Sequence, residues 1–162
     1  MLREDLQSAT RPSWDQMGME TARLWSSRSV DPKHKVGTCI LGSVTGRVVA
    51  VGYNGRAAGE SNEREHQDEG FSGYIHSELN ALLVAQWSTL DPSHTLYVTL
   101  EPCANCARAI LNTRRIGRVV YAKPYVEAER LKRNLPRGSE ILRTGGLECI
   151  SWLSKSLLHS NI

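Results

Sequence analysis

His76-Ser77-Glu78 and Pro102-Cys103-Ala104-Asn105-Cys106 are the two segments around which the chain is organised. Together they offer one imidazole and two thiols, which are side chains that zinc prefers, and one carboxylate. A catalytic zinc takes three protein ligands and keeps one position open for water. It also needs a group that moves protons between that water and the substrate. The segments therefore predict a zinc site with His76, Cys103 and Cys106 as ligands and Glu78 as the proton carrier.

The spacing within each segment predicts where its helix begins. Cys103 and Cys106 are three positions apart, which places both sulfurs on one side of a helical turn, and Pro102 suits the start of that helix. His76 and Glu78 would point roughly 200° apart inside a regular helix. They can face one target only if His76 precedes the helix. We therefore expect the metal between two helix N-termini, each of which follows a strand or a loop.

Hydrophobic periodicity and turn residues predict the remaining elements. Helices are expected from Pro12-Ser13-Trp14-Asp15 to about residue 28, and at residues 76–87, 104–112 and 127–134. Strands are expected at residues 36–44, 48–53, 95–100, 118–121 and 147–152, with Thr45-Gly46 as a two-residue turn and a long polar loop up to about residue 74. This order predicts an α/β fold, a three-layer α-β-α sandwich with a central mixed sheet of about five strands. Residues 1–162 are expected to form one domain.

Four residues of the first predicted helix are expected to contact the core: Met17, Ala22, Leu24 and Trp25. Two cysteines outside the zinc segments, Cys39 and Cys149, lie in apolar strand-like runs, and we expect both to be buried packing residues.

Composition narrows the class of protein. The 162 residues are 40% hydrophobic and 23% charged, with a net charge of +3, as is ordinary for a globular domain. No run of Lys and Arg suggests a nucleic-acid tract, no apolar stretch reaches the roughly 18 residues of a membrane span, and the N-terminus has no apolar signal-peptide core. We therefore expect neither a membrane nor a nucleic-acid partner, and a cytoplasmic location, that of the host if the source is a virus.

The zinc segments have other interpretations. A Cys-x-x-Cys pair can be a redox centre or half of a structural zinc site. A structural site needs a fourth protein ligand, for which His66 and His94 are the candidates. Such a site would make the protein a zinc-stapled binding module without catalysis.

Beyond these arguments, the chain resembles the deoxycytidylate (dCMP) deaminase family, within the cytidine-deaminase-like group, from about residue 22 to residue 125. Four pieces carry the resemblance: Asp31-Pro32-Lys33-His34-Lys35-Val36-Gly37, Gly52-Tyr53-Asn54-Gly55, His76-Ser77-Glu78-Leu79-Asn80-Ala81 and Leu96-Tyr97-Val98-Thr99-Leu100-Glu101-Pro102-Cys103-Ala104-Asn105-Cys106-Ala107. The zinc segments are shared by the whole group. The Gly-Tyr-Asn-Gly piece and Asn80 point to the dCMP branch.

The resemblance implies hydrolytic deamination of dCMP to dUMP and ammonia, a step that feeds thymidylate synthesis, with one catalytic Zn²⁺ per subunit. Glu78 would take a proton from the water at the zinc and pass protons to N3 and to the departing amino group. Asn54 would hold the sugar, Arg28 would reach the 5′-phosphate, and Tyr125 would close over the nucleotide. The family also implies a homo-oligomer, often a hexamer.

The chain departs from the family pattern after Gly-Tyr-Asn-Gly, where Arg56-Ala57 stands in place of an aromatic-proline pair. In the family this loop contributes to an effector site for dCTP and dTTP, so regulation is in doubt or altered, and Arg56 becomes a candidate contact for a phosphate or an effector. A triphosphate effector would bring Mg²⁺ with it. Ser77 also replaces the usual Ala.

The substrate stays open on sequence alone. The alternatives are another cytosine nucleotide (dCTP or a 5-substituted dCMP), an RNA base such as tRNA adenosine, free cytosine, guanine or a riboflavin precursor. The zinc segments are common to enzymes that act on all of these.

Overall fold

A five-stranded mixed sheet forms the centre of the computed structural model, which describes residues 11–153. Its strands are β1 (Gly37–Gly42), β2 (Val48–Tyr53), β3 (His94–Leu100), β4 (Ile116–Lys123) and β5 (Glu148–Ser151). They lie in the order β2-β1-β3-β4-β5; β1 is antiparallel to β2 and β3, whereas β3, β4 and β5 run parallel. The predicted mixed sheet is confirmed.

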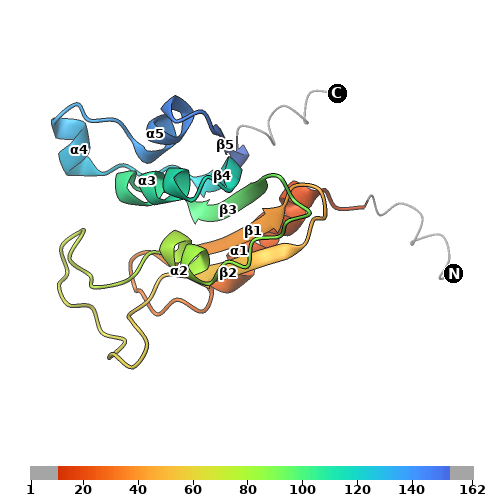
Figure 1. The fold of residues 1–162 in the computed structure, drawn as a ribbon. Helices are drawn as coiled ribbons and strands as arrows, with labels where there is room; N and C mark the ends of the chain where they lie inside the picture. Colours follow the sequence, from red (N-terminus) through yellow and green to blue (C-terminus); the bar gives the residue numbers. More distant parts are fainter. Residues whose placement is uncertain (1–10, 154–162) are drawn as a thin grey trace, which may run out of the picture.

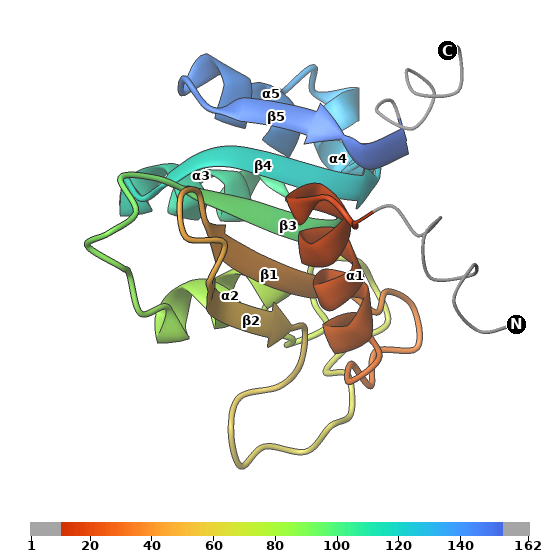
Figure 2. The same cartoon turned by 90° about the vertical axis from the view of Figure 1, so that its right-hand side faces the viewer.

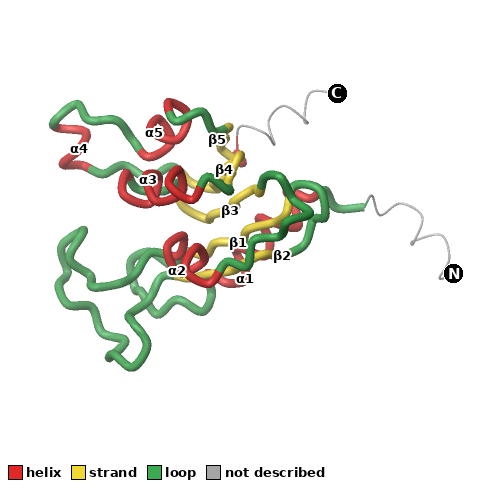
Figure 3. The backbone as a smooth tube through the Cα atoms, in the orientation of Figure 1, coloured by secondary structure: helices red, strands yellow, loops and turns green. Residues whose placement is uncertain are grey.

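Helices cover both faces of this sheet (Figures 1 and 2). The helices are α1 (Trp14–Ser26), α2 (Ser77–Val84), α3 (Ala104–Thr113), α4 (Ala128–Lys132) and α5 (Gly138–Thr144). Figure 2 shows α1 on one face, with α2, α3 and α5 on the other. The three-layer α-β-α prediction is therefore confirmed. In the tube of Figure 3, a long loop between β2 and α2 extends beyond these layers.

Alternation along the strands divides the core into two clusters. In β1, Ile40 packs toward α2 and α3, whereas its neighbours Cys39 and Leu41 pack toward α1. In β3, Leu96 faces the first cluster and Tyr97 the second. The sheet is thus apolar on both faces, as a sheet covered by helices must be.

The buried face of α1 is only partly the predicted one. Ala22 is buried as expected, and Trp25 is half-buried with its ring stacked on Tyr53. Met17 and Leu24 were predicted wrongly, because they are 47% and 70% exposed. The helix is turned so that its buried positions are Asp15, Gly18, Met19 and Ala22.

Asp15 can lie on the buried face of α1 because partners inside the protein compensate its negative charge. Its carboxylate accepts two hydrogen bonds from Arg118, at 2.6 and 2.9 Å, and one from the Tyr97 hydroxyl at 2.8 Å. Buried charges are stable only with such partners. The interaction joins α1 to β3 and β4, and a hydrophobic pattern alone cannot reveal it.

The connection between β1 and β2 is longer than the predicted two-residue turn. β1 ends at Gly42 and the connection spans residues 43–47. Asp91 holds it, since its carboxylate accepts hydrogen bonds from the backbone of Val44 and Thr45 and from the Thr45 hydroxyl. The distant Asp91 replaces the local turn geometry that the sequence suggested.

Helix α5 was absent from the prediction. It is short, and its start lacks the usual Ser, Thr, Asp or Asn. Glu140 instead accepts a hydrogen bond from the backbone N–H of Arg137 at 2.8 Å. This pairing of a residue with a Glu three positions later was the available signal.

Two glycines allow the helices to approach the strands closely. A Cβ at Gly52 in β2 would lie 2.5 Å from the Ser77 carbonyl oxygen, and one at Gly37 in β1 would lie 2.0 Å from the Ala22 carbonyl oxygen. Gly52 therefore sets the position of the start of α2, where the first zinc segment lies. The long loop is closed at its base by backbone hydrogen bonds between Gly55 and Ile75.

Within residues 11–153, none of the helices combines the length and the apolar character needed to cross a membrane. The prediction that the chain has no signal peptide concerns its amino-terminal residues, which lie outside the described range.

Candidate metal centre and catalytic pocket

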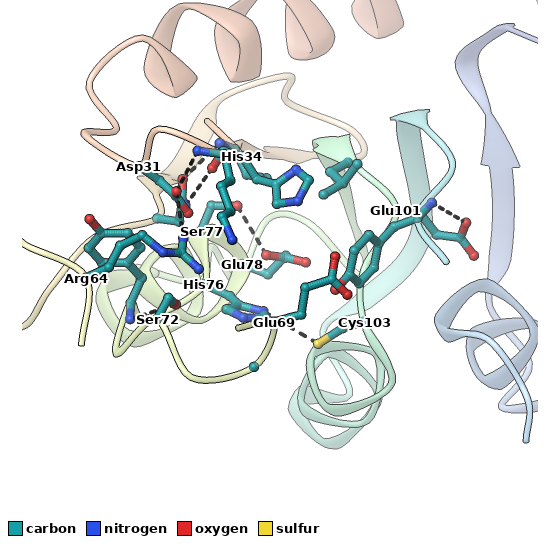
Figure 4. A pocket seen from close by; sticks show the side chains of 17 residues that line it. Asp31, His34, Arg64, Glu69, Ser72, His76, Ser77, Glu78, Glu101 and Cys103 are labelled. Carbon is teal, nitrogen blue, oxygen red and sulfur yellow. Dashed lines mark hydrogen bonds and ion pairs between the residues drawn. The ribbon is translucent and has the colours of Figure 1, made fainter. Parts of the chain in front are cut away.

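Both zinc segments place a ligand candidate directly before a helix. His76 has extended backbone angles (φ −67°, ψ 150°), and α2 begins at the next residue. Cys103 is likewise extended (φ −67°, ψ 169°), and α3 begins at Ala104. The structure confirms the local geometry predicted from the spacing of His76 and Glu78, and it brings the two helix starts together (Figure 4).

The side chains of His76, Cys103 and Cys106 converge. Nδ1 of His76 lies 3.5 Å from Sγ of Cys103 and 3.3 Å from Sγ of Cys106, and all three ligand atoms lie within 4.8 Å of one another. Zinc–sulfur bonds of about 2.3 Å and zinc–nitrogen bonds of about 2.0 Å at tetrahedral angles imply a sulfur–nitrogen separation of roughly 3.5 Å. Both the donor set and its spacing therefore fit zinc.

The electrostatics of the cluster also favour a cation. Hydrogen bonding from the Cys106 thiol, and then from His76, lowers the pKa of Cys103 to about 4, so its sulfur is a thiolate at neutral pH. The same hydrogen bond raises the pKa of Cys106, which holds the shared proton. The bond to Cys103 raises the pKa of His76 to about 9. A bound metal takes the place of these protons.

Cys39 and Cys149 differ from this pair. Both are buried, as predicted, and burial raises their pKa values to about 12 and about 11. They remain neutral thiols, which suits packing rather than metal binding.

Glu78 lies beside the cluster and is only 4% exposed. Its carboxylate points into the pocket (Figure 4) and accepts a hydrogen bond from the Ser77 hydroxyl at 3.1 Å. Ser77 in turn lies 2.7 Å from the Thr38 hydroxyl. Burial raises the pKa of the Glu78 carboxyl, while His76 and the Ser77 hydrogen bond act in the opposite direction. A carboxyl that gains affinity for a proton on burial suits a proton carrier.

Carboxylates that the sequence reading did not assign support the second helix start. Glu127 accepts a hydrogen bond from the Ala104 backbone N–H at 3.0 Å, at the first residue of α3. Glu101 is fully buried and accepts hydrogen bonds from the Arg137 guanidinium and from the backbone N–H of Tyr125. Glu101 thus fixes Cys103 relative to Tyr125.

A cavity of about 90 Å³ opens over the cluster. Its walls include His76, Glu78 and Cys103, together with two residues that the sequence assigned to the substrate, Asn54 and Tyr125. Tyr125 is half-buried, and its ring meets the His34 ring edge-on at 6.2 Å.

Asn54 is already engaged with the protein. Its Oδ1 accepts a hydrogen bond from Val36 N–H at 2.8 Å, and its Nδ2 donates to the His34 carbonyl and to Asp31. Asn54 therefore holds residues 31–36 in place along the cavity wall, and a lone pair of its Oδ1 is the group left for a sugar hydroxyl.

The structure does not bring Arg28 or Arg56 into this cavity. Arg28 is exposed, and its guanidinium lies over the Tyr53 ring, 5.9 Å from the centroid. Arg56 forms ion pairs with Glu60 at 3.3 Å and Glu65 at 2.7 Å. Neither residue is among those that line the cavity.

The candidates for a fourth protein ligand lie elsewhere. His94 is buried against the Trp87 ring, and His66 accepts a hydrogen bond from the Asp68 backbone within the long loop. Among residues 11–153, the cluster that could hold a metal ion consists of His76, Cys103 and Cys106.

The long loop, residues 56–74, forms part of the cavity wall through contacts that the sequence did not indicate. Arg64 pairs with Asp31 at 2.7 Å, and both side chains are 6% exposed. The same guanidinium lies 5.6 Å from the centroid of the Tyr74 ring. Glu69 from this loop also lines the cavity (Figure 4). Pairs so distant in sequence leave no local pattern.

Comparison with known proteins accords with this geometry. Residues 12–123 match the family model described as the cytidine and deoxycytidylate deaminase zinc-binding region. The chain belongs to this family. The zinc-binding character of the deaminase family and the His/Cys/Cys cluster together support Zn²⁺ as the metal.

Relatives within the family are named deoxycytidylate deaminases. A probable deoxycytidylate deaminase of Drosophila melanogaster is 35% identical over 121 residues, 67% of this chain and 58% of that protein. The deoxycytidylate deaminase of enterobacteria phage T4 is 28% identical, and the match covers 86% of this chain and 90% of that protein. The structure of the dCMP deaminase of cyanophage S-TIM5 was solved with dCMP and dUMP. It is similar to this chain with a TM-score of 0.70 at 26% sequence identity, and the match covers 88% of this chain and 99% of the cyanophage chain. The chain spans less than two thirds of the length of the Drosophila melanogaster protein and of two other eukaryotic deoxycytidylate deaminases.

Proposed function

We propose that the protein is a zinc-dependent deaminase that hydrolyses dCMP to dUMP and ammonia. One observation carries the proposal: a three-ligand zinc donor set converges beside a buried carboxylate that is not part of it. Three protein ligands leave a position for water, as catalytic zinc sites require. The choice of dCMP is supported by relatives named deoxycytidylate deaminases and by the similar structure solved with dCMP and dUMP.

In this proposal His76, Cys103 and Cys106 hold the metal. When bound, zinc supplies a Lewis acid that lowers the pKa of water. Glu78 accepts a proton from the water that attacks C4 and donates protons to N3 and to the departing amino group. Its burial keeps solvent away from these transfers, and the Ser77 hydroxyl orients one of its oxygens. Asn54 and Tyr125 border the space where the base and sugar would lie.

Ammonia release from matched substrates tests the proposal. The zinc-loaded protein is assayed with dCMP, cytidine, dCTP, a 5-substituted dCMP and an RNA hairpin. We expect kcat/KM for dCMP to exceed those for cytidine and RNA by at least roughly tenfold, since differences in bound groups of this size are readily discriminated. A preference for RNA would contradict the substrate assignment. Zinc held by four protein side chains would contradict catalysis altogether.

Further aspects of the family stay predictions for this chain. A homo-oligomer, with a hexamer as one form, is supported by large apolar residues exposed on α1 and α2, such as Leu24 and Leu83. Regulation by dCTP and dTTP, with Mg²⁺ on the triphosphate, would require Arg56 to leave Glu60 and Glu65 if it is the effector contact.

Ser77 provides a prediction specific to this chain. Ser77→Ala restores the residue usual in the family but removes a buried hydrogen bond of 3.1 Å to the Glu78 carboxylate, so we expect kcat to fall about threefold with KM nearly unchanged. Steady-state kinetics with dCMP measure the change. Ser72→Ala is the control, because Ser72 lines the same cavity and its hydroxyl bonds to the Tyr74 backbone instead. Equal effects of the two substitutions would contradict the role of Ser77.

A further inference from the structure

The size of the catalytic cavity limits what it can enclose. Its volume is about 90 Å³, whereas sites that bind small molecules usually span roughly 300–1,000 Å³. This space suits a pyrimidine ring with the adjoining sugar edge and not a whole nucleotide. The phosphate of a nucleotide must therefore lie outside it, and the charges of the surrounding side chains determine on which side.

The side formed by the long loop is unfavourable for a phosphate. Arg64 is the cation there, but Figure 4 shows it turned toward Asp31, with which it forms a buried ion pair. Glu69 also lines this wall, and its negative charge forms no ion pair with a residue in the range 11–153. A phosphate dianion would meet a carboxylate on this side and no available cation from the loop.

A second cavity of about 420 Å³ lies on the other side. The two cavities share the wall formed by Lys33, His34, Val36 and Leu100. The lining of the second cavity includes four cationic side chains and no carboxylate from the described residues: Arg23, Lys33, Lys35 and Lys123. Its size and its charge suit the phosphate-bearing end of a nucleotide.

Two of these cations are available to a ligand. Arg23 is paired with Glu20, and the Lys33 ammonium donates to the Gln67 carbonyl. Lys35 and Lys123 form no ion pair with any residue in the range 11–153. Lys35 precedes β1, and Lys123 ends β4 beside Leu100 of β3.

We propose that the second cavity is the phosphate subsite of the substrate and that Lys35 and Lys123 bind the 5′-phosphate. The inference rests on the proposed deamination of dCMP, and it makes these lysines the determinants of nucleotide over nucleoside. It also differs from the expectation drawn from resemblance, since Arg28 lines neither cavity.

The test compares dCMP with deoxycytidine, which lacks the phosphate. In the zinc-loaded Lys35→Gln/Lys123→Gln variant we expect kcat/KM for dCMP to fall by about tenfold for each lysine, mainly through KM, because each loses a charge-assisted hydrogen bond. Turnover of deoxycytidine should not change. Lys132→Gln/Arg133→Gln is the matched control, because it removes the same charge from α4 and its end, outside both cavities. Arg28→Gln tests the alternative phosphate contact.

Three results would overturn the inference: equal losses for dCMP and deoxycytidine in the lysine variant, the same loss in the α4 control, or a dCMP-specific loss confined to Arg28→Gln. Equilibrium binding of dUMP and deoxyuridine gives a readout independent of turnover. If the wild-type protein releases no ammonia from dCMP, the proposed function fails. A lysine-dependent preference for dUMP over deoxyuridine would then still support the subsite, and its absence would refute it.

Discussion

Replacing Glu78 by Gln is expected to lower kcat for dCMP by roughly 10²-fold or more while the protein keeps its zinc. Gln preserves the size of the side chain and can still accept a hydrogen bond from Ser77, which lies 3.1 Å from the carboxylate. It cannot take up and release a proton. Because Glu78 is not a member of the metal-binding cluster, the metal should be unaffected by the change. Kinetics and metal analysis of the same preparation measure both quantities.

Glu69→Gln is the matched control for that experiment. Glu69 also lines the catalytic cavity, but it belongs to the long loop and is exposed. We expect its substitution to leave kcat within a few-fold of the wild type, because an exposed carboxylate has no special role in proton transfer at the metal. Near-normal turnover in Glu78→Gln, or an equal loss in Glu69→Gln, would remove Glu78 from its proposed role.

The elements that hold the proposed metal ligands could be predicted from sequence because their signals are local. His76 and Glu78 are two positions apart, and this spacing alone required a helix to start between them, as α2 does at Ser77. Cys103 and Cys106 needed only one helical turn. The alternation of apolar residues likewise located the sheet strands, since it depends on neighbours two positions apart.

What the sequence did not reveal depends on pairs of distant residues. Met17 was expected in the core because it is apolar. However, Asp15 pairs with Arg118 of β4 on the face that α1 covers, so α1 lies with Asp15 buried and Met17 exposed. Arg64 and Asp31, which are 33 positions apart, join the long loop to the rest of the cavity wall. The charges around the catalytic cavity depend on such pairs. The basic lining of the second cavity can therefore be recognised from the structure and not from the sequence.

Replacing Cys106 by Ser is the second change with a large expected effect. Serine nearly preserves the shape of the side chain, but its hydroxyl is a poor zinc ligand compared with a thiolate. Loss of a supporting residue around a metal ligand typically costs 10–100-fold in affinity or activity, so loss of a ligand should exceed about 10²-fold in zinc affinity. We expect the variant to lose its zinc to a chelator at concentrations that leave the wild type loaded, and to lose turnover with it.

Cys149→Ser makes the same chemical change at another buried thiol and is the control for packing. Cys149 lies outside the metal-binding cluster, and burial raises its pKa to about 11. This variant should lose some thermal stability and retain zinc. If Cys106→Ser also retained zinc, the cluster would not be the metal site. The two predictions together separate the roles: Glu78→Gln removes turnover without removing zinc, whereas Cys106→Ser removes turnover because it removes zinc. A site whose carboxylate was itself a ligand would lose metal in both variants.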